Sequence, residues 1–384
     1  KLFKSLLVAP AALGLLTPFS ASANEVNLND ISNYSDIEDI ELSNSFDEED
    51  SVESTLLAGG EGLVDSYDGS FSTTTTASFG ADFVIGSVDG AGISATSSKE
   101  AVTFDYQYGM SLSTSFTGED SLDLTIETGN GDSTVGSSAV LNMNAMSDKM
   151  TLDGITYTFP LGDSATVMVG DSTDVSALYS TACTYSAFTD LLGNCGSGNA
   201  AGLGGGGTTS ISSATIAASY DFGNGFTVAG GLSGEGEGTN GLFTKEGMDV
   251  YGVQAAYNTD TYGASLSYAL TDTSETAETT YWGFNAFYSF DGEGLPSISV
   301  GYESEDPSAS ATEEGYFVGL TWDSVGPGSL SVGMSSLENY TSAQTEYYQY
   351  EAAYSYPIND GVTITPGVFI KEGSTDQTGV IVKT

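Results

Sequence analysis

The stretch that decides the fold is Val102-Thr103-Phe104-Asp105-Tyr106-Gln107-Tyr108-Gly109-Met110-Ser111-Leu112. Its even-numbered residues are apolar or aromatic, whereas its odd-numbered residues are small or polar. Successive side chains of a β-strand point to opposite faces, so the stretch predicts a strand with one apolar face and one polar face. Such a strand suits a sheet that has lipid on one side and water on the other.

The same alternation recurs from about residue 70 to the end of the chain, and it predicts sixteen strands. No charged residue falls on the apolar faces, where a charge would cost about 2–4 kcal/mol at the bilayer midplane. A soluble β-sandwich also alternates, but aromatic residues in nearly every strand favour a membrane barrel. The other apolar faces span residues 79–85, 122–126, 155–159, 165–169, 214–220, 226–232, 251–257, 262–268, 282–290, 298–302, 316–322, 330–334, 348–354, 362–370 and 380–382.

The connections between these strands alternate in length, and this is a feature independent of the side-chain alternation within the strands. The tight ones are rich in Asn, Asp, Gly and Pro and suit hairpin turns; they span residues 118–120, 160–163, 221–225, 258–261, 291–294, 323–328 and 357–361. The others are mostly longer: 87–101, 128–149, 171–209, 234–248, 271–280, 304–314, 336–345 and 373–377. Short periplasmic turns, long outer loops and an even strand count are typical of outer-membrane barrels. The sequence therefore predicts an all-β, antiparallel up-and-down barrel over residues 70–384.

The two ends of the chain add further expectations. Lys1 and Lys4 precede an apolar run over residues 6–16, and Ala21-Ser22-Ala23 follows it. This order predicts a signal peptide over residues 1–23, cleaved between Ala23 and Asn24. Residues 24–69 form an acidic segment and linker that we expect to be extended. The last strand stops at Val382-Lys383-Thr384 without the terminal aromatic residue usual in such barrels, so we expect it to be truncated.

The charge excludes several functions. The chain has 52 acidic residues, seven basic residues and no His, which gives a net charge of −45. Such a chain does not suit nucleic acid, because binding it requires Lys and Arg to neutralise phosphates. Without His, Ser-His-Asp and Cys-His catalysis and His-based metal sites are unavailable. We therefore expect no enzyme activity, no metal site and no cofactor; the acidity also has a simpler reading, as an adaptation to a saline habitat.

The third outer connection, residues 171–209, is the longest and carries both cysteines, Cys183 and Cys195. An even pair of cysteines in an exported chain predicts a disulfide, with free thiols as the alternative. We expect the loop to fold into the lumen and narrow it, because a sixteen-stranded barrel otherwise leaves a wide aqueous channel. The alternative is an outer loop that only resists proteases.

If the loop folds inward, its carboxylates face the pore; these are Asp171, Asp174 and Asp190. Other side chains on the polar faces of the strands are expected to line the lumen, namely Asp82, Asp105, Gln107, Asp123, Glu127, Glu303, Glu351 and Lys371. Rings of Asp or Glu favour cations, so the pattern predicts weak cation preference that fades as ionic strength rises. The simpler alternative is that these carboxylates are only solvated.

Residues 154–170, Gly-Ile-Thr-Tyr-Thr-Phe-Pro-Leu-Gly-Asp-Ser-Ala-Thr-Val-Met-Val-Gly, resemble a strand hairpin of cyanobacterial outer-membrane porins. The stretches Phe104-Asp105-Tyr106-Gln107-Tyr108 and Asn27-Leu28-Asn29-Asp30-Ile31-Ser32 resemble the same group, which is related to carbohydrate-selective porins and often labelled an iron-uptake porin. The resemblance implies a homotrimer in the outer membrane of a Gram-negative-type, cyanobacterial envelope, in contact with lipid and lipopolysaccharide. It also implies passive diffusion of inorganic ions or small hydrophilic solutes.

The N-terminal segment departs from that family, and other functions remain open as alternatives. Many of its members carry an N-terminal S-layer-homology domain, but residues 24–69 are too short and too acidic for a complete one. A carbohydrate-selective porin remains an alternative function. A surface adhesin or structural barrel that forms no channel is a further alternative, although no short Gly-Asp repeat recurs in the chain.

Overall fold

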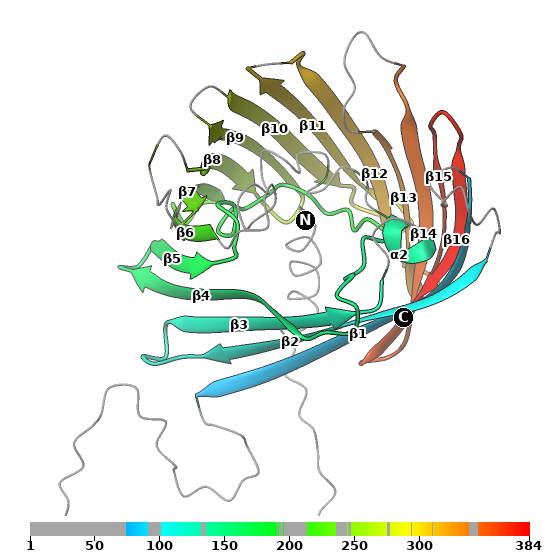
Figure 1. Ribbon diagram of the computed structural model, residues 1–384, viewed down its shortest axis with the longest axis horizontal. Helices are drawn as coiled ribbons and strands as arrows, with labels where there is room; N and C mark the ends of the chain where they lie inside the picture. Colours follow the sequence, from blue (N-terminus) through cyan, green and yellow to red (C-terminus); the bar gives the residue numbers. More distant parts are fainter. Residues whose placement is uncertain are drawn as a thin grey trace, which may run out of the picture. The chain divides into compact units, whose positions relative to one another are not determined.

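The computed structural model describes residues 74–90, 101–131, 136–189, 191, 195, 213–235, 244, 247–274, 277–292, 294–308, 310–337 and 345–384. In that part of the chain sixteen antiparallel strands form a closed barrel, which confirms the predicted fold (Figure 1). Each strand pairs with its neighbours in sequence, and β1 pairs with β16 to close the sheet. The predicted signal peptide (1–23) and acidic segment (24–69) lie outside the described residues.

The strands differ in length from seven to fifteen residues. Their bounds are β1 Thr75–Asp89, β2 Val102–Thr114, β3 Ser121–Gly129, β4 Thr151–Leu161, β5 Ala165–Asp171, β6 Ser213–Asp221, β7 Phe226–Glu235, β8 Asp249–Asn258, β9 Tyr262–Ser274, β10 Ala277–Ser289, β11 Ser297–Pro307, β12 Glu313–Val325, β13 Gly328–Ser336, β14 Tyr348–Asn359, β15 Val362–Lys371 and β16 Gln377–Lys383. One short helix, α2 (Gly136–Val140), lies within the connection from β3 to β4. None of the described helices is long and apolar enough to cross a membrane.

The outer wall carries the apolar phase of every strand, as the alternation predicted. Phe104 is 61% exposed and Phe83 is 47% exposed, and their rings stack across the β1–β2 ladder at 6.2 Å. On the opposite phase, Ser267 and Asn285 are fully buried. Apolar side chains face outward because lipid solvates them there, while every backbone polar group in the ladder finds a partner within the sheet.

Several strands run past the bounds that the sequence predicted, and one helix was missed. Residues 271–280 and 304–314 were expected to be loops, yet β9 continues to Ser274 and β11 to Pro307. Apolar alternation stops in these segments because the strands leave the hydrocarbon layer, while Thr and the neighbouring polar residues still support a ladder in water. The apolar pattern therefore marks the membrane-facing part of a strand rather than its whole length.

The turn between β2 and β3 is held by one carboxylate. Asp120 Oδ1 accepts hydrogen bonds from the Phe116 and Thr117 backbone amides and from the Ser115 and Thr117 hydroxyls, at 2.8–2.9 Å. Its other oxygen accepts a bond of 2.6 Å from the hydroxyl of Tyr157 on β4. The Tyr157 hydroxyl, together with the donors of the turn, lowers the pKa of Asp120 from its ordinary value. Hydrogen bonds to the ionised form have this effect because protonation would weaken them.

We predict that Asp120→Asn lowers the urea midpoint of the folded barrel at neutral pH. A group whose folded pKa is depressed contributes stability above its unfolded pKa of about 3.9, and loses it as the pH falls towards the folded value. The difference between the wild type and the variant should therefore shrink below about pH 4. Urea titrations in detergent at several pH values measure this. Asp163→Asn, in the exposed β4–β5 turn, is the control; equal midpoints for Asp120→Asn and the wild type at pH 7 would contradict the assignment.

Candidate functional site

The inner wall of the barrel carries the side chains that alternate with the exposed apolar ones. Every residue predicted to line the lumen lies on this inward phase: Asp82 (β1), Asp105 and Gln107 (β2), Asp123 and Glu127 (β3), Glu303 (β11), Glu351 (β14) and Lys371 (β15). These side chains differ in how much of them is exposed to the lumen. Glu127, Glu303 and Glu351 are 3–7% exposed, whereas Asp82, Asp105 and Asp123 are half-buried and Lys371 is exposed.

The third outer loop follows this inner wall around much of the barrel. Side chains on successive strands bond to its backbone: the Thr215 hydroxyl donates to the Thr173 carbonyl at 2.7 Å, and the Ser180 amide donates to Gln254 Oε1 at 2.7 Å. Further along, the Ala182 amide donates to Ser265 Oγ, the Thr184 amide to Ser299 Oγ, and Asn285 Nδ2 to the Cys195 carbonyl, at 2.8–3.1 Å. The described part of the loop therefore lies flat on strands β6 to β11 and, as shown below, reaches β14.

A series of glycines on the inward phase makes room for the loop. A Cβ atom at Gly252 would lie 2.5 Å from the Tyr179 hydroxyl. One at Gly319 or Gly333 would collide with the Tyr185 side chain, and one at Gly367 with the Phe188 ring. We call Gly252, Gly301, Gly319, Gly333 and Gly367 the glycine track; at Gly301 the colliding group is the Cys195 carbonyl. Any side chain in this track would push the loop into the lumen.

Apolar contacts hold the loop onto the track. Val175 packs with Val250, Ala269 and Tyr281. Burying one such side chain contributes about 1.5–3 kcal/mol, more than the 0.5–1.5 kcal/mol of a typical neutral hydrogen bond. Each buried apolar side chain therefore contributes more than each hydrogen bond, while the more numerous hydrogen bonds set the register of the loop.

A second cluster lies under residues 185–189 of the third loop, which we call the loop tip. Tyr185 and Leu191 pack on Phe317, with the Tyr185 and Phe317 rings 5.1 Å apart. The Cys183–Cys195 disulfide is present beside this cluster. Burial, and then the nearby Glu351 carboxylate, raise the pKa of the Tyr185 phenol, so this phenol remains a hydrogen-bond donor.

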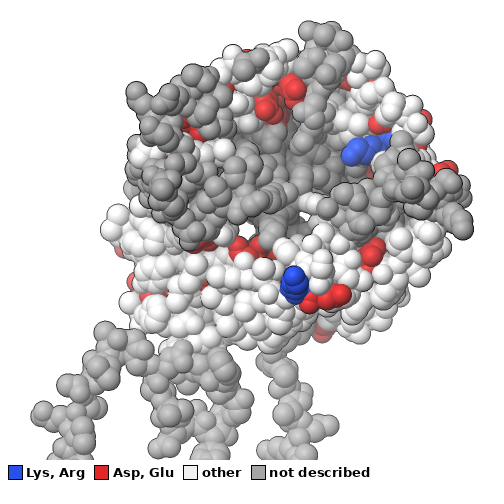
Figure 2. Space-filling view, viewed as in Figure 1, with Lys and Arg blue, Asp and Glu red and all other residues white. Residues whose placement is uncertain are grey.

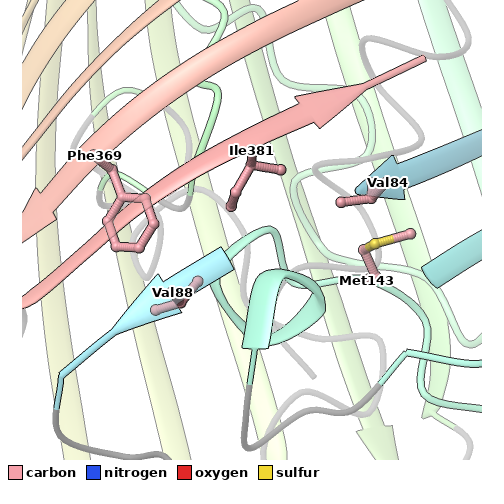
Figure 3. Close-up of a cluster of buried hydrophobic side chains, with 5 residues drawn as sticks. All are labelled: Val84, Val88, Met143, Phe369 and Ile381. Atoms are coloured by element: carbon pink, nitrogen blue, oxygen red, sulfur yellow. The ribbon is translucent and has the colours of Figure 1, made fainter. Parts of the chain in front are cut away.

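The connection from β3 to β4, called the second loop here, also lies against the inner wall. Met143 packs against Val84 and Val88 of β1, Phe369 of β15 and Ile381 of β16, where the barrel closes (Figure 3). Val140 and Leu141 from this loop and Phe188 from the third loop pack on the same cluster. The two loops therefore meet at the β1–β16 seam. The sequence contains a signal for the two clusters on which the loops dock. Large apolar residues such as Phe317, Phe369 and Ile381 lie on a strand phase that is otherwise polar.

A polar network anchors the second loop beside that cluster. Lys383 forms an ion pair of 3.4 Å with Asp82, which also accepts a bond of 2.6 Å from Gln107 Nε2. Gln107 Oε1 accepts from the Asn144 backbone amide at 3.2 Å, and Asn144 Nδ2 donates to Glu127 Oε2 at 2.9 Å. The network joins β16, β1, β2 and β3 to the loop.

Three carboxylates on this side of the lumen are partly exposed, namely Asp82, Asp105 and Asp123. We call them the acidic wall.

Of the carboxylates expected on the third loop, the two described ones, Asp171 and Asp174, do not face the lumen as a charged constriction. Asp171 ends β5 opposite Ile155, on the outward-facing phase, so its register does not place it in the lumen. Asp174 is only 9% exposed. Asp190 lies outside the described residues. The intervening residues 175–189 contain no charged side chain, and their exposed members are Ala177, Thr184, Ser186 and Ala187. Much of this segment is buried against the inner wall, where an unpaired charge would carry a large desolvation cost.

The lumen therefore has two unlike sides. The described third loop offers small neutral groups, and the acidic wall offers carboxylates. Acidic side chains are also spread around the mouth shown in Figure 2, where basic groups are confined to small areas. Among the described residues, no group of three or more His, Cys, Asp or Glu side chains is arranged to hold a metal ion. Carboxylates on one wall attract cations.

Comparisons with known proteins agree with this geometry. The model of the family described as "Gram-negative porin" matches residues 81–377. Similar solved structures include Pseudomonas putida OprB at high pH (12% identity, TM-score 0.58, covering 80% of this chain and 93% of that one). They also include a variant of Rh. blastica porin (13%, 0.51, 80% and 99%) and Vibrio cholerae OmpT with loop L8 deleted (12%, 0.52, 81% and 99%). No curated protein matches the chain in sequence.

We predict that Gly319→Ala disturbs the third loop without unfolding the barrel. Its new methyl group must displace the Tyr185 ring, and such overpacking costs about 1–3 kcal/mol. The matched control is Gly109→Ala, on the inward phase of β2, where nothing lies within 4 Å of the added Cβ. Limited proteolysis of the folded protein should cut the third loop faster in Gly319→Ala only. Equal cleavage rates in both variants would show that the loop does not depend on the track.

Proposed function

We propose, on the premise that this chain belongs to the Gram-negative porin family, that it lets small hydrophilic solutes and inorganic ions diffuse across the outer membrane with a weak preference for cations. Family membership makes the protein a passive outer-membrane channel rather than an enzyme. The preference and the solute class are the proposal. The observation that carries them is the unlike charge of the two sides of the lumen, with carboxylates on β1 to β3 facing an uncharged loop.

Cation preference follows from the balance of charge along the acidic wall. Asp82 is partly neutralised by its ion pair with Lys383. Asp105 and Asp123 remain partly exposed, and neither forms an ion pair among the described side chains. A channel lined by one sign of charge with low-dielectric walls concentrates counter-ions. The preference should be weak, because a few partly exposed carboxylates in a wide aqueous lumen are screened by salt within about 8–10 Å.

The carbohydrate-selective alternative receives less support from the lumen. Sugar recognition commonly uses exposed aromatic faces, because apolar sugar faces stack on them. Three inward-facing rings, Tyr281, Phe317 and Phe369, are instead 7% exposed or less, since the two loops cover them. Only Phe287 of β10 is a partly exposed ring on the inward phase of the described strands. A single partly exposed ring favours passage of ions and small solutes over a series of stacking sites.

We also propose that the protein forms a homotrimer in the outer membrane. A homotrimer in contact with outer-membrane lipid and lipopolysaccharide fits the continuous apolar outer wall and the family. A cyanobacterial source, with iron among the ions that pass, rests on the resemblance of residues 154–170 and is part of the hypothesis. Cross-linking of the purified protein in detergent would give the number of copies.

We predict that the double variant Asp105→Asn/Asp123→Asn reduces cation preference while still forming channels. Removing two carboxylates of the acidic wall should move the reversal potential in a salt gradient towards zero, with the largest change at low salt because screening is weakest there. Planar-bilayer recordings of the wild type and the variant measure this. The control is Asp163→Asn, in the exposed turn between β4 and β5, which should leave the reversal potential unchanged.

Two outcomes would contradict the proposal. If the double variant keeps the wild-type reversal potential at every salt concentration, the acidic wall does not set selectivity. If liposomes containing the wild type swell in sugars but not in salts of similar hydrated size, the carbohydrate alternative is correct.

A further inference from the structure

The tip of the third loop is bonded to a single carboxylate of the barrel wall. Glu351, on the inward phase of β14, is 3% exposed. Its Oε1 accepts from the Tyr185 hydroxyl at 2.7 Å and the Phe188 backbone amide at 2.8 Å. Its Oε2 accepts from the Thr189 backbone amide at 2.7 Å and from the Thr189 hydroxyl. Four neutral donors, all from residues 185–189, thus converge on one carboxyl group.

This arrangement does not serve the packing of the barrel itself. On the same face, Glu351 pairs across the ladder with Gly333 on β13 and Phe369 on β15. Gly333 leaves the space that the Tyr185 side chain fills, and Gly367 on β15 leaves the space for Phe188. Gln349, two residues before Glu351, adds a bond of 2.8 Å from its Nε2 to the Thr189 hydroxyl. The wall around Glu351 is therefore shaped to receive the loop tip.

The carboxylate is also too well covered to act as a lumen charge. Its four bonds occupy both oxygens, and the loop tip lies between it and the lumen. Removing the carboxylate would leave the Thr189 and Phe188 amides facing the wall without an acceptor, so these groups would turn towards the water of the lumen. The tip would then move from the wall into the passage.

We propose that Glu351 is the positioning residue that keeps the passage open, by holding residues 185–189 of the third loop flat on the glycine track. The inference rests on the proposed channel function and adds a determinant of pore width that is separate from the acidic wall. It assigns two different roles to carboxylates on the same inward phase. Asp105 and Asp123 act on passing ions through their charge, and Glu351 acts on the loop through its hydrogen bonds.

The test is single-channel recording of Glu351→Gln in planar bilayers. The substitution keeps the size of the side chain but replaces an acceptor oxygen with an N–H donor that faces other donors. We expect the mean conductance to fall about twofold and the open-channel current noise to rise, because a freed tip narrows the passage intermittently. The reversal potential should stay close to the wild-type value, since the carboxylate was already covered. Glu351→Asp keeps an acceptor for the loop and should restore part of the conductance.

Asp123→Asn is the matched control, because it makes the same chemical change on the inner wall at a residue whose only described side-chain bond is a 2.7 Å contact with Ser121. It should shift the reversal potential and leave the noise unchanged. Wild-type conductance and noise in Glu351→Gln would overturn the inference. If Glu351→Gln does not assemble, Thr189→Val decides, because it removes one donor and leaves the carboxylate; quiet, full-size channels would again overturn the inference. A wild-type protein that forms no channel contradicts the proposed function instead, so the two failures are distinguishable.

Discussion

The structure depends on one constraint: in lipid, every backbone N–H and C=O of the sheet must find a partner within the sheet. The ladder therefore has to close, and here β1 closes it by pairing with β16. Closure fixes which phase of each strand faces lipid, because a shift of one residue would turn every apolar side chain inward. Outward positions are thus committed to the membrane. Inward positions are free to vary, and everything that distinguishes this barrel lies there.

That freedom is used in two ways around the circumference. Over β6 to β15 the inward phase is rich in Gly, Ser and Thr with a few large apolar residues, and the third loop lies on much of it. Glu303 and Glu351 are buried on this phase, and Lys371 is exposed. Over β1 to β3 it carries carboxylates, and the second loop covers only part of it. A loop that buries one face against a wall needs neutral side chains on that face, because an unpaired buried charge is costly; residues 175–189 carry no charge. We therefore propose that selectivity and pore width depend on different parts of the lumen.

The fold was accessible from the sequence because its signal repeats. Alternation, turn composition and loop length each pointed to sixteen strands, and the closed sheet agrees. Strand ends were less predictable, since Thr-rich segments such as 271–274 continue the ladder in water without apolar residues. The roles of inward residues were least predictable. Glu351 and Asp123 both lie on the inward phase and both carry a carboxylate. The third loop covers Glu351 but not Asp123, because burial depends on where a distant loop docks. Only the inward apolar residues, such as Phe317 and Phe369, signal that docking in the sequence.

The central claim is that this barrel is an open channel whose selectivity comes from carboxylates on one wall. The most direct test is to record the unaltered, purified protein in a planar bilayer that separates two concentrations of KCl. We expect discrete channels with a reversal potential of the sign given by K⁺ preference, decreasing in magnitude as both salt concentrations are raised. Absence of channels, or a reversal potential of the sign given by Cl⁻ preference, would contradict it.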